Sequence, residues 1–193
     1  MLQRLYARIL DIADGPHALL ALLAVAFAES SFFPIPPDVL LIPMILARPS
    51  QAFRLAAYAT LASVVGGMLG YAIGYFLFDA IGRPILEYNH AMGSYEALKA
   101  GFAQWGVCII IIKGMTPIPY KLVTIASGVA HFDFASFVGA SIVSRSLRFF
   151  LLAALLWWFG DAARAFIERR LMLVTSVFAI LLVGGIVAVA IYK

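Results

Sequence analysis

The chain has 193 residues, of which 64% are hydrophobic and only 12% are charged. A soluble globular protein is closer to half apolar and a quarter charged, so this composition predicts an integral membrane protein. The net charge of +4 is too small to indicate nucleic-acid binding, and the single cysteine excludes an intramolecular disulfide. The length predicts a single membrane domain over residues 1–193.

The first long apolar segment, residues 18–47, is interrupted by two acids, Glu29 and Asp38, and by the proline-rich stretch FPIPPD. Proline lacks a backbone N–H and its ring clashes with the preceding helical turn, so the stretch is expected to end one helix and begin another. Halves of about a dozen residues cannot cross a hydrocarbon layer of ~30 Å. The prolines expected to break this segment into a hairpin are Pro34, Pro36 and Pro37.

Residues 55–78 form the first charge-free run that is long enough to span a membrane as one helix. Gly66, Gly70 and Gly74 are spaced four residues apart in this run, which is typical of close packing between membrane helices. The next stretch, residues 84–102, is polar enough to predict a surface helix that links two halves of the protein.

A second interrupted segment, residues 103–130, has basic residues where the first has acids. Its stretch TPIPYK contains Pro117 and Pro119 followed by Lys121, and Lys113 precedes the stretch. The two prolines are expected to divide this segment into short half-helices, as in the first segment.

Two further spans are predicted. Residues 134–160 are long enough to cross a membrane although they contain Arg145 and Arg148, and residues 171–192 form a charge-free C-terminal transmembrane helix. The two arginines are spaced i, i+3 and therefore share one helix face. Arg145 falls ~16 Å along its helix, near the middle of a bilayer.

The two interrupted segments are similar to each other in sequence. Residues 34–42 align with residues 117–125, which lie 83 positions later, and both following spans end in an Asp-Ala motif with a nearby arginine. The alignment predicts one repeat over about residues 18–83 and a second over about residues 103–164. Because one span separates the interrupted segments, they would enter the membrane from opposite faces. Paired, proline-interrupted segments of this kind indicate the midplane site of a transporter.

Each interrupted segment is either a broken helix that crosses the membrane or a re-entrant hairpin that returns to its own side. Cytoplasmic loops collect Lys and Arg, and the hairpin arrangement places all four arginines around the first segment in the cytoplasm. These are Arg4, Arg8, Arg48 and Arg54. We therefore predict an all-α integral membrane protein with an inverted repeat of two re-entrant helical hairpins, each followed by a transmembrane helix, and a C-terminal transmembrane helix. The predicted location is the cell inner (plasma) membrane, multi-pass, with a cytoplasmic N-terminus.

Charged residues inside a bilayer are costly, so those in the apolar segments are functional candidates. Glu29 and Asp38 are candidate proton carriers, because a carboxyl group that is buried beside a cation can titrate near neutral pH. In the alternative, Glu29 is an acid in a shallow, wetted hairpin and Asp38 only complements the dipole of the half-helix that it begins. Asp38 and Lys121 are also expected to neutralise each other in part where the hairpin tips meet.

The arginine pair is the first candidate for a phosphate site, because guanidinium groups make bidentate contacts with phosphate. Arg145 is the preferred clamp, since it is the deeper residue and Arg148 can reach water more easily along its side chain. The alternative is that both arginines form structural ion pairs with the two membrane acids.

These features resemble the DedA membrane proteins, also called VTT-domain or SNARE-associated proteins. The resemblance covers about residues 15–165 and rests on the stretches ESSFFPIPPD and KGMTPIPYKLVTIASGVAHFDFASFVGASIVSR. The stretch TPIPYK is most similar to the short YqaA-like branch of the family. The resemblance implies two opposed re-entrant hairpins, a role in membrane homeostasis and movement of lipids between leaflets. It also implies polyprenyl phosphates or phospholipids as substrates, with proton coupling.

By position, the resemblance implies that Glu29 and Asp38 are the membrane acids of the family. It likewise implies that Lys113 and Lys121 are the basic residues beside the proline loop that bind the substrate phosphate. Those positions are often arginine in the family, and lysine lacks the planar fork of donors. This difference makes the arginine pair the stronger candidate for the phosphate site.

The leading functional hypothesis is a lipid flippase or scramblase for a phosphate-bearing lipid. The alternatives are a proton-coupled transporter of a small soluble anion and a non-transporting membrane assembly protein. The sequence has no visible nucleophile–base pair, phosphate loop or metal-ligand spacing, so we expect neither an enzyme nor a cofactor or metal site. The expected partners are membrane lipids and protons, with no nucleic acid, and a homo-oligomer is left open.

Overall fold

The computed structural model describes residues 15, 17–33, 35–88, 92–116 and 119–169. Within these ranges all regular secondary structure is helical, in agreement with the predicted all-α class. The predicted C-terminal transmembrane helix, residues 171–192, lies outside the described residues, as do Pro34 and Pro117.

The helices follow one another along the chain with short connections. In order they are α2 (Ala18–Ser31), α3 (Asp38–Ala47), the 3-10 helix η1 (Pro49–Gln51), α4 (Ala52–Leu77), the π-helical turn η2 (Phe78–Gly82), α5 (Arg83–Tyr88), α6 (Met92–Met115), α7 (Tyr120–Val129) and α8 (Phe134–Arg169). In the described part of the chain, three segments are long and apolar enough to cross a membrane: Pro49–Leu77, Tyr95–Met115 and Phe134–Gly160.

Helices end and begin again around both proline-rich stretches. α2 ends at Ser31, and α3 begins at Asp38, directly after Pro36 and Pro37. α7 begins directly after Pro119. Proline suits these positions because its fixed φ matches the start of a helix, where its missing N–H leaves no bond unmade.

The second interrupted segment departs from the expected pair of short half-helices. α6 is one element from Met92 to Met115, with a kink at Trp105, where φ is −129° and ψ is 15°. The kink lies close to residue 103, where the sequence predicted the surface helix to give way to a half-helix. Residues 94–104 contain no proline, so the chain bends there and remains helical on both sides.

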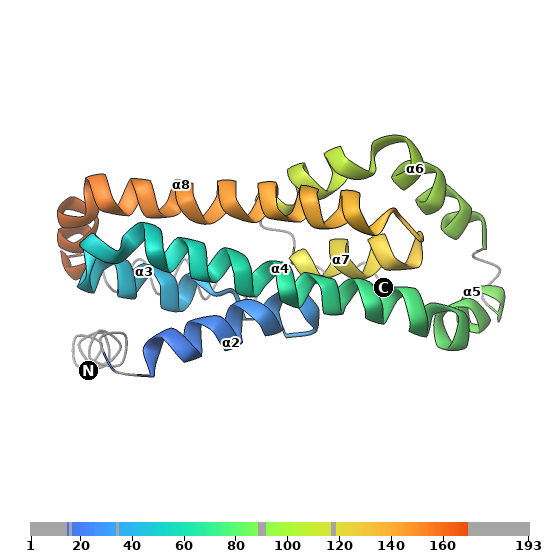
Figure 1. Cartoon of the computed structure of the whole chain (residues 1–193), viewed down its shortest axis with the longest axis horizontal. Helices are drawn as coiled ribbons and strands as arrows, with labels where there is room; N and C mark the ends of the chain where they lie inside the picture. Colours follow the sequence, from blue (N-terminus) through green and yellow to red (C-terminus); the bar gives the residue numbers. More distant parts are fainter. Residues whose placement is uncertain (1–14, 16, 34, 89–91, 117–118, 170–193) are drawn as a thin grey trace.

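The long helices α4 and α8 run antiparallel along the whole molecule (Figure 1). α2 and α3 lie along one half of this pair, on the left in Figure 1, and α7 lies along the other half. The chain reverses direction between α2 and α3 near the middle of the molecule. α2 and α7 pack on α4, whereas α3 and α6 pack on α8.

The glycine stripe of α4 allows α2 and α7 to approach it closely. A Cβ atom on Gly66 would overlap the carbonyl oxygen of Phe27 in α2, and one on Gly74 would overlap that of Ile125 in α7. Gly70, between them, faces both helices. The close packing predicted from the four-residue spacing is therefore confirmed, and one stripe serves two partners in succession.

Two apolar clusters fill the two halves of the molecule. One cluster joins α2, α3, α4 and α8 around Leu22, Ile45 and Phe149, and the other joins α4, α6, α7 and α8 around Ile110 and Phe137. Buried polar side chains occupy the middle section between them. They are Glu29, Ser30, Ser31, Thr60, Ser63, Thr124, Ser127, Ser141, Ser144 and Arg145. These buried polar side chains thus lie away from the ends of the long helices.

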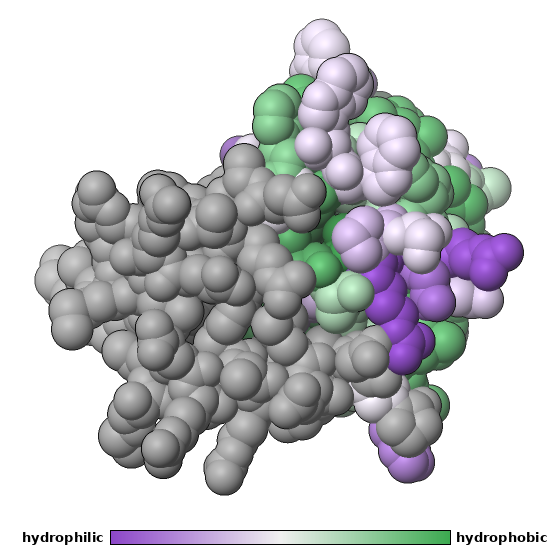
Figure 2. Space-filling model, turned by 90° about the vertical axis from the view of Figure 1, so that its left-hand side faces the viewer, coloured by the Kyte–Doolittle hydropathy of each residue, from purple (hydrophilic) through white to green (hydrophobic). Residues whose placement is uncertain are grey.

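The outer surface carries many large apolar side chains. Leu20, Phe76 and Trp158 are 66%, 71% and 78% exposed. Figure 2 looks onto the end of the molecule where α3 ends and α4 begins, and its hydrophilic side chains gather on one side, next to apolar ones. An exposed apolar surface of this extent suits contact with lipid, and with the three long apolar helices it indicates a membrane protein.

Candidate functional site

The end of α2 brings a carboxylate into the buried middle of the molecule. Glu29 lies two residues before the end of this helix and is 9% exposed. Its Oε2 accepts hydrogen bonds from Arg145 Nη2 and Ser30 Oγ, each at 3.2 Å, and its Oε1 accepts one from the backbone N–H of Tyr120 at 3.4 Å. Glu29 therefore connects α2 with α8 and with the start of α7.

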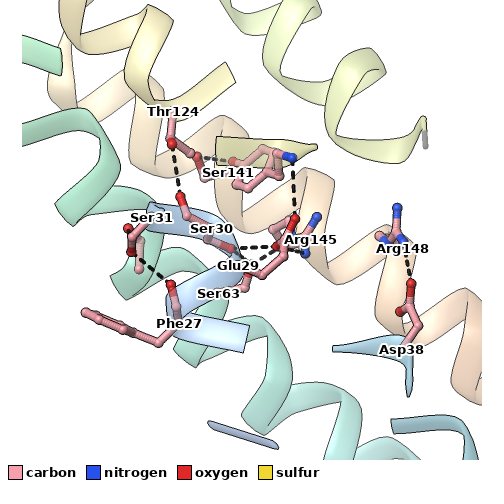
Figure 3. A network of polar contacts seen from close by, with 12 residues as sticks. Phe27, Glu29, Ser30, Ser31, Asp38, Ser63, Thr124, Ser141, Arg145 and Arg148 are labelled. Atoms are coloured by element: carbon pink, nitrogen blue, oxygen red, sulfur yellow. Dashed lines mark hydrogen bonds and ion pairs between the residues drawn. The ribbon is translucent and has the colours of Figure 1, made fainter. Parts of the chain in front are cut away.

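Arg145 is held from several sides at once. Its side chain is 2% exposed, and its Nε donates to Ser63 Oγ of α4 at 2.7 Å while Nη2 forms the ion pair with Glu29 (Figure 3). The guanidinium also lies 4.6 Å from the ring centre of Tyr120 and 4.7 Å from that of Phe149. Ion pairing and two cation–π contacts compensate the loss of water around this charge.

Small hydroxyl side chains complete this network. Ser30 Oγ and Ser63 Oγ are 2.6 Å apart, and Thr124 Oγ1 donates to the backbone oxygen of Ser30 at 3.0 Å. Tyr120 OH donates to Ser141 Oγ at 2.7 Å. These bonds join α2, α4, α7 and α8, so the polar groups that each helix buries find partners on the others.

A second ion pair lies beside the first and is more open. Arg148 Nη2 binds Asp38 Oδ2 at the start of α3, and Arg148 Nη1 donates to the backbone oxygen of Thr116 at 3.4 Å. The two charged side chains are 26% and 22% exposed. The other carboxylate oxygen, Asp38 Oδ1, is buried and accepts no hydrogen bond from the described residues.

The two lysines take different places around this pair. Lys113 is exposed near the end of α6, and Lys121 Nζ donates to the backbone oxygen of Phe32, at the end of α2, at 3.4 Å. We expected Asp38 and Lys121 to neutralise each other, but Asp38 is paired with Arg148. Lys121 instead stabilises the carbonyl end of a helix, where a positive charge is favourable.

All four charged members of the two pairs are visible in the sequence as candidates, but their hydroxyl partners are not. A signal for Ser63 was present, because Thr60, Ser63, Gly67 and Gly70 recur on one face of the predicted span. Small and polar residues at this spacing indicate an interface that also accepts hydrogen bonds. Among the described residues, no group of His, Cys, Asp and Glu side chains has an arrangement that would hold a metal ion.

Most of the chain matches one protein family. A family model described as the VTT domain matches residues 16–157, which include both interrupted segments and both ion pairs. An uncharacterized protein of Haemophilus influenzae is 37% identical over 170 residues, 88% of each chain. A protein of Histophilus somni, also uncharacterized, is 37% identical over 167 residues, 86% of this chain and 87% of the relative.

A more distant relative comes from an archaeon. An uncharacterized protein of Methanocaldococcus jannaschii is 25% identical over 127 residues, 64% of this chain and 74% of the relative. No solved structure gives a significant match.

Proposed function

Since the chain belongs to the VTT-domain family of membrane proteins, the DedA family, we propose that it moves a phosphate-bearing lipid between the leaflets of the membrane. The substrate class is a polyprenyl phosphate or a phospholipid. The observation that carries the proposal is the Arg148–Asp38 ion pair. Its guanidinium is partly exposed in the middle of the molecule and is bound by a carboxylate. A phosphate group offers the same pair of acceptor oxygens as that carboxylate.

The proposed arrangement in the membrane is two re-entrant hairpins in an inverted repeat. α2, α3 and α7 contain 14, 10 and 10 residues. At 1.5 Å per residue these helices reach ~21 Å at most, less than the ~30 Å of a hydrocarbon layer. α3 of the first unit packs on α8 of the second, and α7 of the second packs on α4 of the first. This reciprocal packing supports an inverted repeat.

We assign different tasks to the two arginines. Arg145 is 2% exposed and already bound to Glu29 and Ser63, so it fits the structural ion pair that joins the hairpins. Arg148 is about a quarter exposed, and its partners within the described part of the chain are Asp38 and one backbone oxygen. The proposed phosphate site is therefore centred on Arg148, although the depth of Arg145 made that residue the first candidate in the sequence.

The proposed step is an exchange of partners. The phosphate binds Arg148 and displaces the carboxylate of Asp38, whose oxygen Oδ1 is buried without a hydrogen-bond donor among the described residues. We propose that the displaced carboxylate takes up a proton, since an unpaired charge inside the bilayer would be costly. Arg148 with Asp38 is neutral, and so is Arg148 with a monoanionic phosphate beside protonated Asp38. The exchange thus couples one proton to one phosphate charge without leaving net charge in the bilayer.

The test is lipid movement in proteoliposomes with the full chain. Arg148→Gln is expected to slow movement of a labelled polyprenyl phosphate or phospholipid at least about tenfold, since a charge-assisted hydrogen bond contributes ~1.5–3 kcal/mol. Asp38→Asn is expected to retain binding but to lose the pH dependence of the rate. Arg54→Gln, a change at an exposed arginine of α4, is the control.

Three outcomes separate the functional hypotheses. Transport of lipid at the wild-type rate by folded Arg148→Gln protein would refute the site. Uptake of inorganic phosphate without lipid movement would favour the transporter of a small soluble anion. If neither solute moves with wild-type protein, a non-transporting assembly role replaces the proposal.

A further inference from the structure

A cavity of about 450 Å³ lies away from both ion pairs, at the other end of α7. Its walls come from the first part of α6 and from residues 130–133, which join α7 to α8, at the right-hand end of Figure 1. Four charged or titratable side chains line it: Glu96, Lys99, His131 and Asp133. Phe102 and Phe132 also line it, with ring centres 5.9 Å apart.

The walls of this cavity are fixed by packing. The ring of Phe132 fits against Gly106, where a Cβ atom would overlap it, just after the α6 kink at Trp105. Tyr71 OH donates to the backbone oxygen of Phe132 at 2.6 Å and anchors the connecting residues to α4. A cavity that is formed before a ligand arrives loses less entropy on binding than one that the ligand must organise.

The charged side chains of the lining are two acids and one lysine. Asp133 Oδ2 accepts the backbone N–H of Ser136 at 2.8 Å, and this hydrogen bond lowers the pKa of Asp133, so that the group is ionised at neutral pH. Lys99 Nζ lies 5.5 Å from the ring centre of Tyr95 and forms no ion pair within the described residues. Glu96 has no ion-pair partner among the described residues. The cavity therefore presents two acids and a lysine, with His131 opposite α6.

The depth of the cavity matches that of lipid head groups. Two of the apolar segments that can cross a membrane, Tyr95–Met115 and Phe134–Gly160, begin at its walls. The start of such a segment lies where hydrocarbon gives way to the polar interface. A ligand in the cavity would therefore have its charged part at head-group level and its tails along the apolar outer face of α6 and α8.

We propose that this cavity binds the head group of a zwitterionic phospholipid, one with a phosphate and a primary ammonium group. Lys99 and His131 contact the phosphate, Glu96 and Asp133 accept the ammonium, and the two phenylalanine rings support the glycerol carbons. An anionic lipid without an ammonium group would meet two uncompensated carboxylates. The site is separate from the Arg148–Asp38 pair, and the assignment does not require that the protein moves lipids.

The experiment measures lipid binding to the purified full chain by native mass spectrometry in detergent, with phosphatidylethanolamine and phosphatidylglycerol of equal chain length. Wild-type protein is expected to bind phosphatidylethanolamine at least about tenfold more tightly, as the loss of one charge-assisted contact weakens binding about tenfold. Lys99→Gln, and the double change Glu96→Gln with Asp133→Asn, are expected to abolish this preference. Asparagine at 133 retains an oxygen that can accept the Ser136 N–H.

The controls are Arg54→Gln and Glu87→Gln, which change exposed charges outside the cavity and are expected to retain the preference. Equal binding of the two lipids by wild-type protein would overturn the proposal, as would an unchanged preference in folded variants. Soluble glycerophosphoethanolamine distinguishes a lipid from a free ligand. Its binding as tightly as the lipid would overturn the assignment to a membrane lipid.

Discussion

Removal of Arg145 from the buried pair is the most direct test of the central network. Arg145→Met keeps an unbranched apolar side chain and removes the charge, so that among the described residues Glu29 keeps only Ser30 Oγ and the Tyr120 N–H as donors. Two unit charges ~4 Å apart interact with ~4 kcal/mol at an effective dielectric constant near 20. Loss of one member of a buried pair typically costs ~3–5 kcal/mol, and we expect a destabilisation in this range.

A second substitution separates the charge pair from the packing of the arginine. Glu29→Gln with Arg145→Met removes both charges, so the double variant is expected to be more stable than Arg145→Met alone, with a coupling energy of ~2–3 kcal/mol. Free energies of unfolding are measured by reversible SDS denaturation in mixed micelles, with Arg54→Met as a matched control on an exposed arginine. If the losses of unfolding free energy in the two single variants add up to that of the double variant within ~0.5 kcal/mol, the coupling is refuted, since independent sites add to this precision.

Two other predictions test the packing and the membrane arrangement. Gly74→Ala is expected to destabilise the protein by ~1–3 kcal/mol in the same SDS titration, because the added Cβ would overlap the backbone of α7. Gly93→Ala is the control: its Cβ would meet open space, so this variant is expected to be as stable as the wild type or more stable. Cysteines that replace Arg4 and Arg48 are expected to be labelled from the cytoplasmic side, and a cysteine that replaces Arg83 from the opposite side. Labelling of positions 4 and 48 from opposite sides would mean that the first interrupted segment crosses the membrane.

The class of the protein and its long helices follow from local properties of the sequence. The predicted spans at residues 55–78 and 134–160 closely match α4 and one of the apolar segments, because length and apolar composition decide whether a helix can cross hydrocarbon. The helix starts after Pro37 and Pro119 follow from the geometry of the proline ring. The length of α6 was underestimated, since proline marks where that helix ends but not where it begins.

The charged candidates were also visible in the sequence, because a charge in an apolar segment is conspicuous wherever the chain folds. Ion pairs between the arginines and the acids were one alternative, but the sequence did not show which acid pairs with which arginine. Glu29 and Arg145 are 116 residues apart, and so distant a contact depends on how α2 and α8 are rotated and shifted against α4. The glycine stripe of α4 sets how close α2 and α7 come to that helix.

The difference between the two arginines shows what tertiary structure alone decides. By sequence, Arg145 and Arg148 share one helix face and one chemistry, and the depth along the helix favoured Arg145 as the ligand-binding residue. In the folded protein Arg145 faces Ser63, Tyr120 and Glu29 and is shut off from solvent, whereas Arg148 is one turn further, beside the start of α3, and stays partly open. Accessibility depends on which other helices cover each position, and no property of α8 by itself contains that information.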